Sequence, residues 1–185
     1  MPEKAIAICG NPRTGGNWLC KLLCEAELGL PDEYISRRIA APLIREWGIA
    51  EEDYWPTLWE KKSPKGIFAI KIHWRELRRK SLNFNPLAVL PPESKKYWIF
   101  QTRDYRQQAI SWAQAVRTGV WFGKTPPATA TEAEIKKFMP PCRSYTINWQ
   151  IWFTKNGIEP LVIPYEKFKA DPDSYVDQIK AMVNG

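Results

Sequence analysis

The chain has 185 residues, of which 44% are hydrophobic and 25% are charged, and its formal net charge at pH 7 is +7. This length and apolar content exclude a disordered chain and predict a single domain over residues 1–185. The positive charge suits anionic ligands, but the basic residues are scattered and carry no RNA-binding signature, so we expect no nucleic-acid partner.

The four cysteines, Cys9, Cys20, Cys24 and Cys142, form neither a CxxC pair nor a metal-ligand pattern. We expect buried thiols in a reducing compartment. No run of apolar residues has the length of a membrane span, and the N-terminus lacks the charged and apolar regions of a signal peptide. We therefore expect a cytoplasmic protein without a membrane span.

The first predicted elements are a strand over 4–9, a glycine loop, and a helix that begins near Trp18 and ends near Gly29. In this order the backbone N–H groups at the helix N-terminus face an anion, and the helix dipole favours it. The loop also contains a cation, Arg13. The alternative is an ordinary strand-to-helix turn, in which the glycines serve only to make the turn tight. That alternative explains the glycines and the cation less well than an anion site does.

The loop has the glycine spacing of a Walker A motif at Gly10 and Gly15, but Gly16 and Asn17 stand where an NTPase needs Lys and Ser/Thr. Such a loop can hold a phosphate but is poorly built for Mg²⁺ and a γ-phosphate. A P-loop kinase is therefore a disfavoured alternative.

Short apolar segments alternate with helical patterns along the rest of the chain. Further strands are predicted over 67–72, 97–101 and 160–163. Further helices are predicted over 105–117, as a short helix capped by Thr131 and Glu134, over 143–156, and from Asp171 onward. The fold class is therefore α/β, a three-layer P-loop fold with a central parallel sheet of about four to five strands flanked by helices.

Two segments, 31–65 and 118–130, fit no single periodicity. Long irregular stretches in a compact domain are usually functional or mobile. We expect 34–62 and 118–130 to shape a ligand pocket, with Trp55 and Trp121 as aromatic side chains that could line it.

A second anion site is predicted at Arg103, which directly follows the third strand, and Ser111, eight residues later on the next helix. The carboxyl ends of parallel strands share one rim, on which the glycine loop also opens. An Arg provides a planar fork for phosphate oxygens. The alternative is that Arg103 pairs with Asp104 or with a helix end.

Candidate proton acceptors lie at the end of the second strand and after the first helix. Alternation along the strand sends Lys71 and His73 to the same face, and His73 is the only histidine in the chain. An imidazole beside a lysine at a strand end is well placed to take a proton, although a structural histidine is the alternative. Glu33 is a second candidate base, with a solvated loop carboxylate as the alternative.

These motifs, and their order along the chain, resemble those of the PAPS-dependent sulfotransferases, most of all the bacterial trehalose 2-sulfotransferase branch. The resemblance covers nearly the whole chain, through the Pro-Arg-Thr-Gly-Gly-Asn-Trp loop, an acidic-Glu-aromatic triplet, the Lys-x-His strand end, an Arg…Ser helix that runs into Thr-Gly-Val-Trp, and a late Gly-Ile-Glu-Pro followed by Tyr-Glu. The corresponding segments are 11–18, 32–34, 71–74, 103–121 and 157–166.

The resemblance implies a role for each matching position. It assigns the 5′-phosphosulfate of PAPS to Arg13, Thr14, Gly15, Gly16, Asn17 and Trp18. It assigns the 3′-phosphate to Arg103 and Ser111, and stabilisation of the transferring sulfuryl group to Lys71. His73 matches the base of the cytosolic sulfotransferases and Glu33 the base of the trehalose enzyme. We favour His73, with Glu33 as its partner or substitute.

The implied activity is transfer of a sulfuryl group from PAPS to a hydroxyl of a carbohydrate or another small metabolite, with PAP as the product. Positioning and electrostatics suffice for this displacement, so no metal is expected. The resemblance also implies a homodimer. Gly16 and Asn17 replace the usual hydroxyl pair of the loop, and the chain ends at Gly185. A catalytically degenerate protein that binds PAPS or PAP, or a regulatory protein of the same fold, is therefore the alternative.

Overall fold

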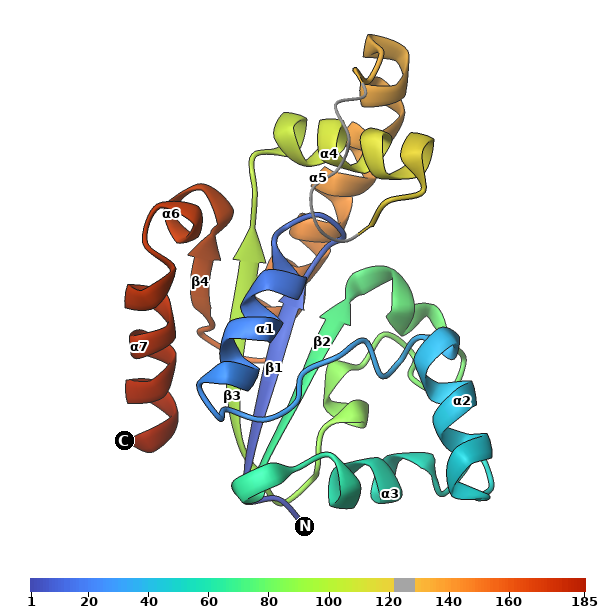
Figure 1. The fold of residues 1–185 in the computed structure, drawn as a ribbon, viewed down its shortest axis with the longest axis vertical. Coiled ribbons are helices and arrows are strands. Elements are labelled where there is room, and N and C mark those ends of the chain that lie inside the picture. Colours follow the sequence, from blue (N-terminus) through green and yellow to red (C-terminus); the bar gives the residue numbers. More distant parts are fainter. Residues whose placement is uncertain (122–128) are drawn as a thin grey trace.

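The computed structural model describes residues 1–121 and 129–185. Across these residues, the four strands form one parallel sheet in the order β2-β1-β3-β4, with helices on both faces (Figure 1). The strands are β1 (Lys4–Gly10), β2 (Ile67–His73), β3 (Lys95–Thr102) and β4 (Leu161–Pro164). The predicted α/β class with a central parallel sheet is confirmed.

Helices precede or follow each strand. The α-helices are α1 (Gly16–Glu25), α2 (Arg37–Trp47), α3 (Tyr54–Lys61), α4 (Tyr105–Thr118), α5 (Glu132–Lys155), α6 (Tyr165–Ala170) and α7 (Pro172–Asn184). Short 3-10 helices are η1 (Pro64–Gly66), η2 (Trp74–Arg78) and η3 (Pro86–Val89). In Figure 1, α1 lies in front of the sheet, α5 passes behind it, and α6 and α7 lie beside β4.

Alternation along the strands produces a core on each face of the sheet. On β1, Ile6 and Ile8 pack with apolar residues of α1, α6 and α7, whereas Ala5, Ala7 and Cys9 pack with those of α3 and α5. Both faces are covered, which is why the strands read as continuous apolar runs in the sequence. This packing brings the carboxyl ends of β1, β2 and β3 to one edge of the sheet.

The long helix α5 differs from the prediction. The predicted capping box of Thr131 and Glu134 is confirmed, but the division into a short helix and a separate helix over 143–156 is wrong, because one helix runs through Pro140 and Pro141. A proline inside a helix removes a hydrogen bond and crowds the preceding turn. Here packing holds both halves in place: Phe138 stacks on Trp112 of α4, and Trp149 is fully buried against the sheet.

The segment 31–65 also differs from the irregular prediction, since it contains α2 and α3. Apolar side chains of α2 pack against the core on the α5 side of the sheet, and they recur at helical spacing as Ile39, Leu43, Ile44 and Trp47. Pro42 lies inside α2 and weakened this pattern in the sequence. Trp55 on α3 packs against the same core rather than lining a pocket.

Smaller differences concern α1 and the thiols. The helix α1 ends at Glu25, earlier than the predicted end near Gly29. Cys9, Cys20 and Cys142 are buried as expected, whereas Cys24 is exposed on the outer side of α1. All four are free thiols in the described structure.

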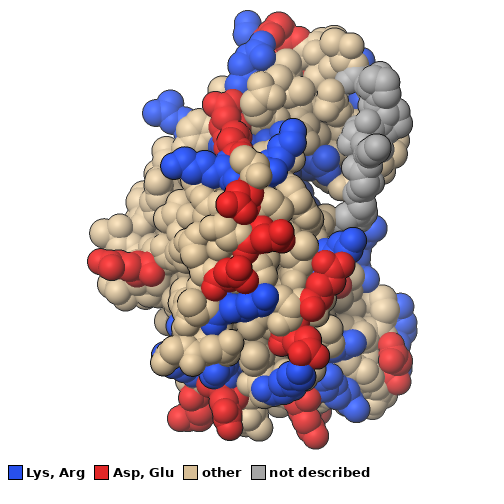
Figure 2. Space-filling view, turned by 60° about the vertical axis from the view of Figure 1, so that its left-hand side comes forward, with Lys and Arg blue, Asp and Glu red and all other residues tan. Residues whose placement is uncertain are grey.

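The surface in Figure 2 carries acidic and basic residues side by side rather than a continuous basic patch on that face. In the part of the chain that the structure describes, no helix is both long and apolar enough to cross a membrane.

Candidate functional site

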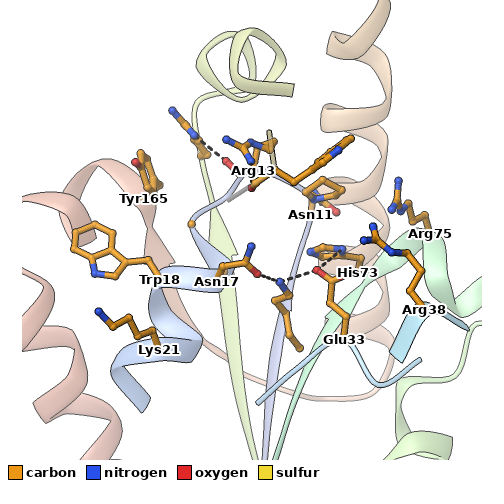
Figure 3. A pocket seen from close by; sticks show the side chains of 16 residues that line it. Asn11, Arg13, Asn17, Trp18, Lys21, Glu33, Arg38, His73, Arg75 and Tyr165 are labelled. Atoms are coloured by element: carbon orange, nitrogen blue, oxygen red, sulfur yellow. Dashed lines mark hydrogen bonds and ion pairs between the residues drawn. The ribbon is translucent and has the colours of Figure 1, made fainter. Parts of the chain in front are cut away.

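A cavity of about 560 Å³ opens at the carboxyl ends of β1, β2 and β3, where the glycine loop turns into α1 (Figure 3). Predicted site residues that line it are Arg13, Gly15, Gly16, Asn17, Trp18, Glu33, Lys71, His73 and Arg103. Trp121 lines it as well, as predicted. Residues 122–128, the rest of the predicted pocket segment up to Thr129, lie outside the described residues.

The glycine loop is shaped to expose backbone N–H groups. Arg13 and Gly15 both have positive φ angles, 72° and 90°, so the backbone curls around the start of α1. Within the described chain, no side chain caps α1 and no acidic residue occupies its first turn. The positive end of the helix dipole is thus free to bind an anion.

Two glycines of the loop are required by close neighbours. A Cβ at Gly15 would lie 2.6 Å from the Cδ2 atom of the Tyr165 ring, and one at Gly16 would lie 2.9 Å from Cδ of Lys71. Contacts this short exclude any side chain without rearrangement. The absence of a side chain at Gly16 is what allows Lys71 to reach the loop.

Arg13 and Arg103 form one end of the cavity. The Arg13 Nε atom donates to Ser111 Oγ at 2.9 Å, and its guanidinium also donates to the Trp121 carbonyl. Arg103 donates to the Arg13 carbonyl at 2.9 Å, and its guanidinium lies 4.1 Å from the centre of the Tyr165 ring. These contacts fix both cations before any ligand binds.

Burial lowers the pKa of both guanidiniums, and for Arg13 the neighbouring Arg103 charge lowers the pKa further. An anion between the two charges would relieve this repulsion. The alternative for Arg103, an ion pair with Asp104, does not occur among the described residues.

Thr14 and Ser111 are the two predicted site residues that do not line the cavity. The Thr14 hydroxyl is buried and donates to the Asn11 carbonyl at 2.9 Å. The Ser111 hydroxyl accepts the hydrogen bond from Arg13. In this structure both hydroxyls support the loop and its arginine.

Lys71 joins the loop to the other end of the cavity. Its side chain is buried, and its Nζ atom donates to Asn17 Oδ1 and lies 2.7 Å from Glu33 Oε1 (Figure 3). Burial acts to raise the pKa of Glu33, but the charges of Lys71 and Arg75, with the Lys71 hydrogen bond, outweigh it and lower that pKa. Glu33 is therefore a carboxylate near neutral pH.

His73 lies beside this ion pair and is almost completely buried. Its Nδ1 atom is 3.8 Å from Glu33 Oε1 and has no hydrogen-bond partner in the described structure. Burial lowers the His73 pKa to about 3, and Glu33 opposes this shift only in part. The imidazole is therefore neutral near pH 7 and free to accept a proton.

Glu33 reaches this position through the backbone. Asp32 forms a parallel bridge with Ile70, and the Lys71 N–H donates to the Asp32 carbonyl at 3.0 Å. The Asp32 carboxylate in turn accepts the Glu33 N–H at 2.7 Å. The chain after α1 thus acts as a short extension of the sheet, and it carries Glu33 to the end of β2.

Sequence reasoning missed several lining residues: Asn11, Pro12, Lys21, Arg38, Arg75 and Tyr165. Signals existed for two of them. Lys21 lies one helical turn after Asn17, and Tyr165 follows the last strand just as Arg103 follows the third. Arg38 had no such signal, because its helix was not predicted.

Comparison with known proteins agrees with this geometry. Residues 93–184 match the family described as "Stf0 sulphotransferase". Over 213 aligned residues the chain is 24% identical to trehalose 2-sulfotransferase of Mycolicibacterium smegmatis, covering 87% of this chain and 77% of the relative.

The similarity to the Stf0 sulphotransferase family covers 92 of the 185 residues, in the C-terminal half of the chain.

The protein is thus a sulfotransferase, and the family match spans Arg103 and Tyr165 but begins after the glycine loop. Within the described residues of this sulfotransferase, no group of three or more His, Cys, Asp and Glu side chains lies close enough together to hold a metal ion.

Proposed function

We propose that this sulfotransferase transfers a sulfuryl group from PAPS to a hydroxyl of a small acceptor, in the first instance a carbohydrate. The observation that carries the proposal is a cavity shared by the anion-binding loop and Arg103 on one side and Glu33 and His73 on the other. The name of the relative, trehalose 2-sulfotransferase, supports a carbohydrate as the acceptor.

The proposed donor site uses the two anion-binding features already described. The N–H groups at the start of α1 hold the 5′-phosphosulfate, and Arg103 holds the 3′-phosphate. Trp18 is half exposed and packs against Phe168 with ring centres 4.7 Å apart, which leaves an aromatic surface beside the loop for the adenine. Arg13, held by Ser111, lies between the two phosphate positions.

The proposed reaction is an in-line displacement at sulfur. The acceptor oxygen forms a new S–O bond, the bond between sulfur and the bridging oxygen of the phosphosulfate breaks, and PAP leaves with that electron pair. The hydroxyl proton passes to His73. Lys71, which contacts Asn17 at the loop, supplies positive charge where the sulfuryl oxygens and the leaving phosphate become more negative.

The pairing of Glu33 with His73 supports His73 as the base. A neutral imidazole can take the proton, and the carboxylate 3.8 Å away stabilises the imidazolium that results. The Glu33 carboxylate is engaged in the ion pair with Lys71, 2.7 Å away, whereas Nδ1 of His73 has no hydrogen-bond partner in the described structure. Glu33 therefore acts as the partner of His73.

The contacts of Gly16 and Asn17 support a working enzyme rather than a degenerate one. Although the usual hydroxyl pair is missing, the space at Gly16 admits Lys71 and the Asn17 amide holds it. A cation from β2 thereby comes close to the start of α1. In a Walker A loop the lysine belongs to the loop itself, whereas here the lysine beside the loop comes from β2.

The proposal is tested by titration of the purified protein with PAP, followed by transfer assays with PAPS and carbohydrate acceptors. We expect PAP to bind at micromolar concentrations and PAPS to be converted to PAP only when an acceptor is present. No PAP binding would contradict the donor assignment. Tight binding of Mg²⁺-ATP with no PAP binding would instead favour a kinase.

A further inference from the structure

Two arginines lie at the end of the cavity that holds the proposed base. Arg38 comes from α2 and Arg75 from η2, and both line the cavity. Figure 3 shows them on the side of Glu33 and His73, away from Trp18 and Tyr165. Neither belongs to the loop or to the Arg103 region that the proposed donor occupies.

The protein pairs these arginines only in part: Arg75 forms an ion pair with Glu76 through Nε, whereas Arg38 has no acidic partner among the described residues. In the described structure, Arg38 has neither an ion-pair nor a hydrogen-bond partner, and its side chain is exposed. Arg75 donates from Nε to Glu76 at 3.0 Å, which leaves its two terminal nitrogens for a ligand. Glu33 is the one carboxylate in the described lining, and Lys71 already neutralises it.

The proposed donor site does not account for the position of these two arginines, at the other end of the cavity. The described lining contains six Lys or Arg side chains against one acid. In the proposed function the negative groups of PAPS bind the α1 N–H groups, Arg13 and Arg103, at the loop end of the cavity and away from Arg38 and Arg75. Guanidiniums whose terminal nitrogens have no partner in the described structure, beside the acceptor position, suit phosphate, sulfate or carboxylate, which they bind through two parallel hydrogen bonds.

We propose that the acceptor is itself an anion: a hydroxyl compound whose phosphate, sulfate or carboxylate group binds Arg38 and Arg75 while its hydroxyl faces His73. This inference rests on the proposed function and deepens it by naming the charge of the acceptor. The group transfer is unchanged: the hydroxyl oxygen attacks sulfur, its proton goes to His73, and PAP leaves. A neutral sugar leaves Arg38 without a counter-charge and the terminal nitrogens of Arg75 without an anionic partner.

The test compares acceptors that differ only in charge. Wild-type protein is assayed with PAPS and with trehalose against trehalose 6-phosphate, and glucose against glucose 6-phosphate and glucuronate. We expect kcat/KM to be about 10- to 100-fold higher for the anionic member of a pair, as charge-assisted hydrogen bonds of usual strength predict. The phosphate and carboxylate arms distinguish which anion is preferred.

Variants assign the preference to the two arginines. Arg38→Gln and Arg75→Gln should remove most of it and leave PAP affinity unchanged. Arg37→Gln and Arg78→Gln are matched controls, since these exposed neighbours on α2 and η2 do not line the cavity. They should keep the wild-type preference.

Two outcomes would overturn the inference while the proposed function stands. One is equal kcat/KM for neutral and anionic acceptors in a protein that binds PAP and transfers sulfuryl groups. The other is weaker PAP binding in Arg38→Gln or Arg75→Gln, which would assign these arginines to the donor. Failure of wild-type protein to bind PAP would overturn the proposed function itself.

Discussion

The two ends of the cavity are built in different ways. At the loop end, Arg13, Ser111, Trp121 and Arg103 are joined by hydrogen bonds, and the loop itself is held by Tyr165. At the other end, Arg38 and Arg75 project from separate elements with few partners. The loop end is therefore preorganised for its ligand. At the base end, the two arginines keep hydrogen-bond donors that a ligand would have to occupy.

The strongest test of this comparison is removal of the proposed base. His73→Gln should lower kcat about 10²- to 10⁴-fold, the usual contribution of general base catalysis, while PAP affinity stays unchanged because the loop end is untouched. Glu33→Gln should lower kcat less. Single-turnover transfer rates and PAP titration measure the two quantities; a larger loss in Glu33→Gln than in His73→Gln would reverse the roles of the two residues.

Removal of a cation at the loop end should lower nucleotide affinity, whereas removal of the base lowers kcat. Arg103→Ala should weaken PAP binding by about 2 kcal/mol, the usual strength of a hydrogen bond to a charged group. Binding of adenosine 5′-phosphosulfate, which lacks the 3′-phosphate, should hardly change. Calorimetric titration of both nucleotides makes this comparison, and equal losses would place the 3′-phosphate elsewhere.

The buried histidine also predicts a pH dependence of stability. The unfolded chain binds a proton at His73 near pH 6.5, whereas the folded protein does so only near pH 3, so protons favour unfolding between these values. The free energy of unfolding should therefore fall as the pH is lowered through this window, by at most about 1.4 kcal/mol per pH unit from this group.

Urea unfolding of wild type and His73→Gln at several pH values measures this slope. The slope from pH 6.5 down to about 4.5 should be smaller in the variant, since the lowered pKa of Glu33 adds its own loss only at more acidic pH. Parallel curves for the two proteins would show that His73 is not kept neutral by the fold.

The smallest expected effect concerns Ser111. It tests whether the Ser111 hydroxyl only supports Arg13 or contacts the nucleotide itself. Ser111→Ala should weaken PAP binding by about 1 kcal/mol, because Arg13 loses one hydrogen bond but keeps the Trp121 carbonyl. The loss should affect PAP and adenosine 5′-phosphosulfate equally. A loss confined to PAP would mean that Ser111 contacts the 3′-phosphate directly.

Local motifs allowed much of the site to be predicted. The glycine loop, Lys71, His73 and Arg103 could be found because each lies at the end of a strand or just after it, and the carboxyl ends of parallel strands lie on one edge of a sheet. Alternation placed Lys71 and His73 on one face, and both line the cavity. The same rule, applied to the last strand, would have found Tyr165.

The contacts between these residues could not be predicted in the same way. Ser111 was expected beside Arg103, yet its hydroxyl holds Arg13, because the positive φ of Arg13 turns that side chain toward α4. Arg38 depends on α2, whose apolar pattern is interrupted by Pro42. Both outcomes depend on packing between elements far apart in the chain.

By itself, the sequence determined the α/β layers, the anion-binding loop and the identity of the catalytic candidates, since periodicity and strand-end position are local properties. The tertiary structure decided that Glu33 lies against Lys71 and His73, through the bridge of Asp32 to β2, and that Lys71 reaches the loop through the space left at Gly16. Burial and ion pairing depend on neighbours brought together by folding, so the charge state of the proposed base is a property of the fold.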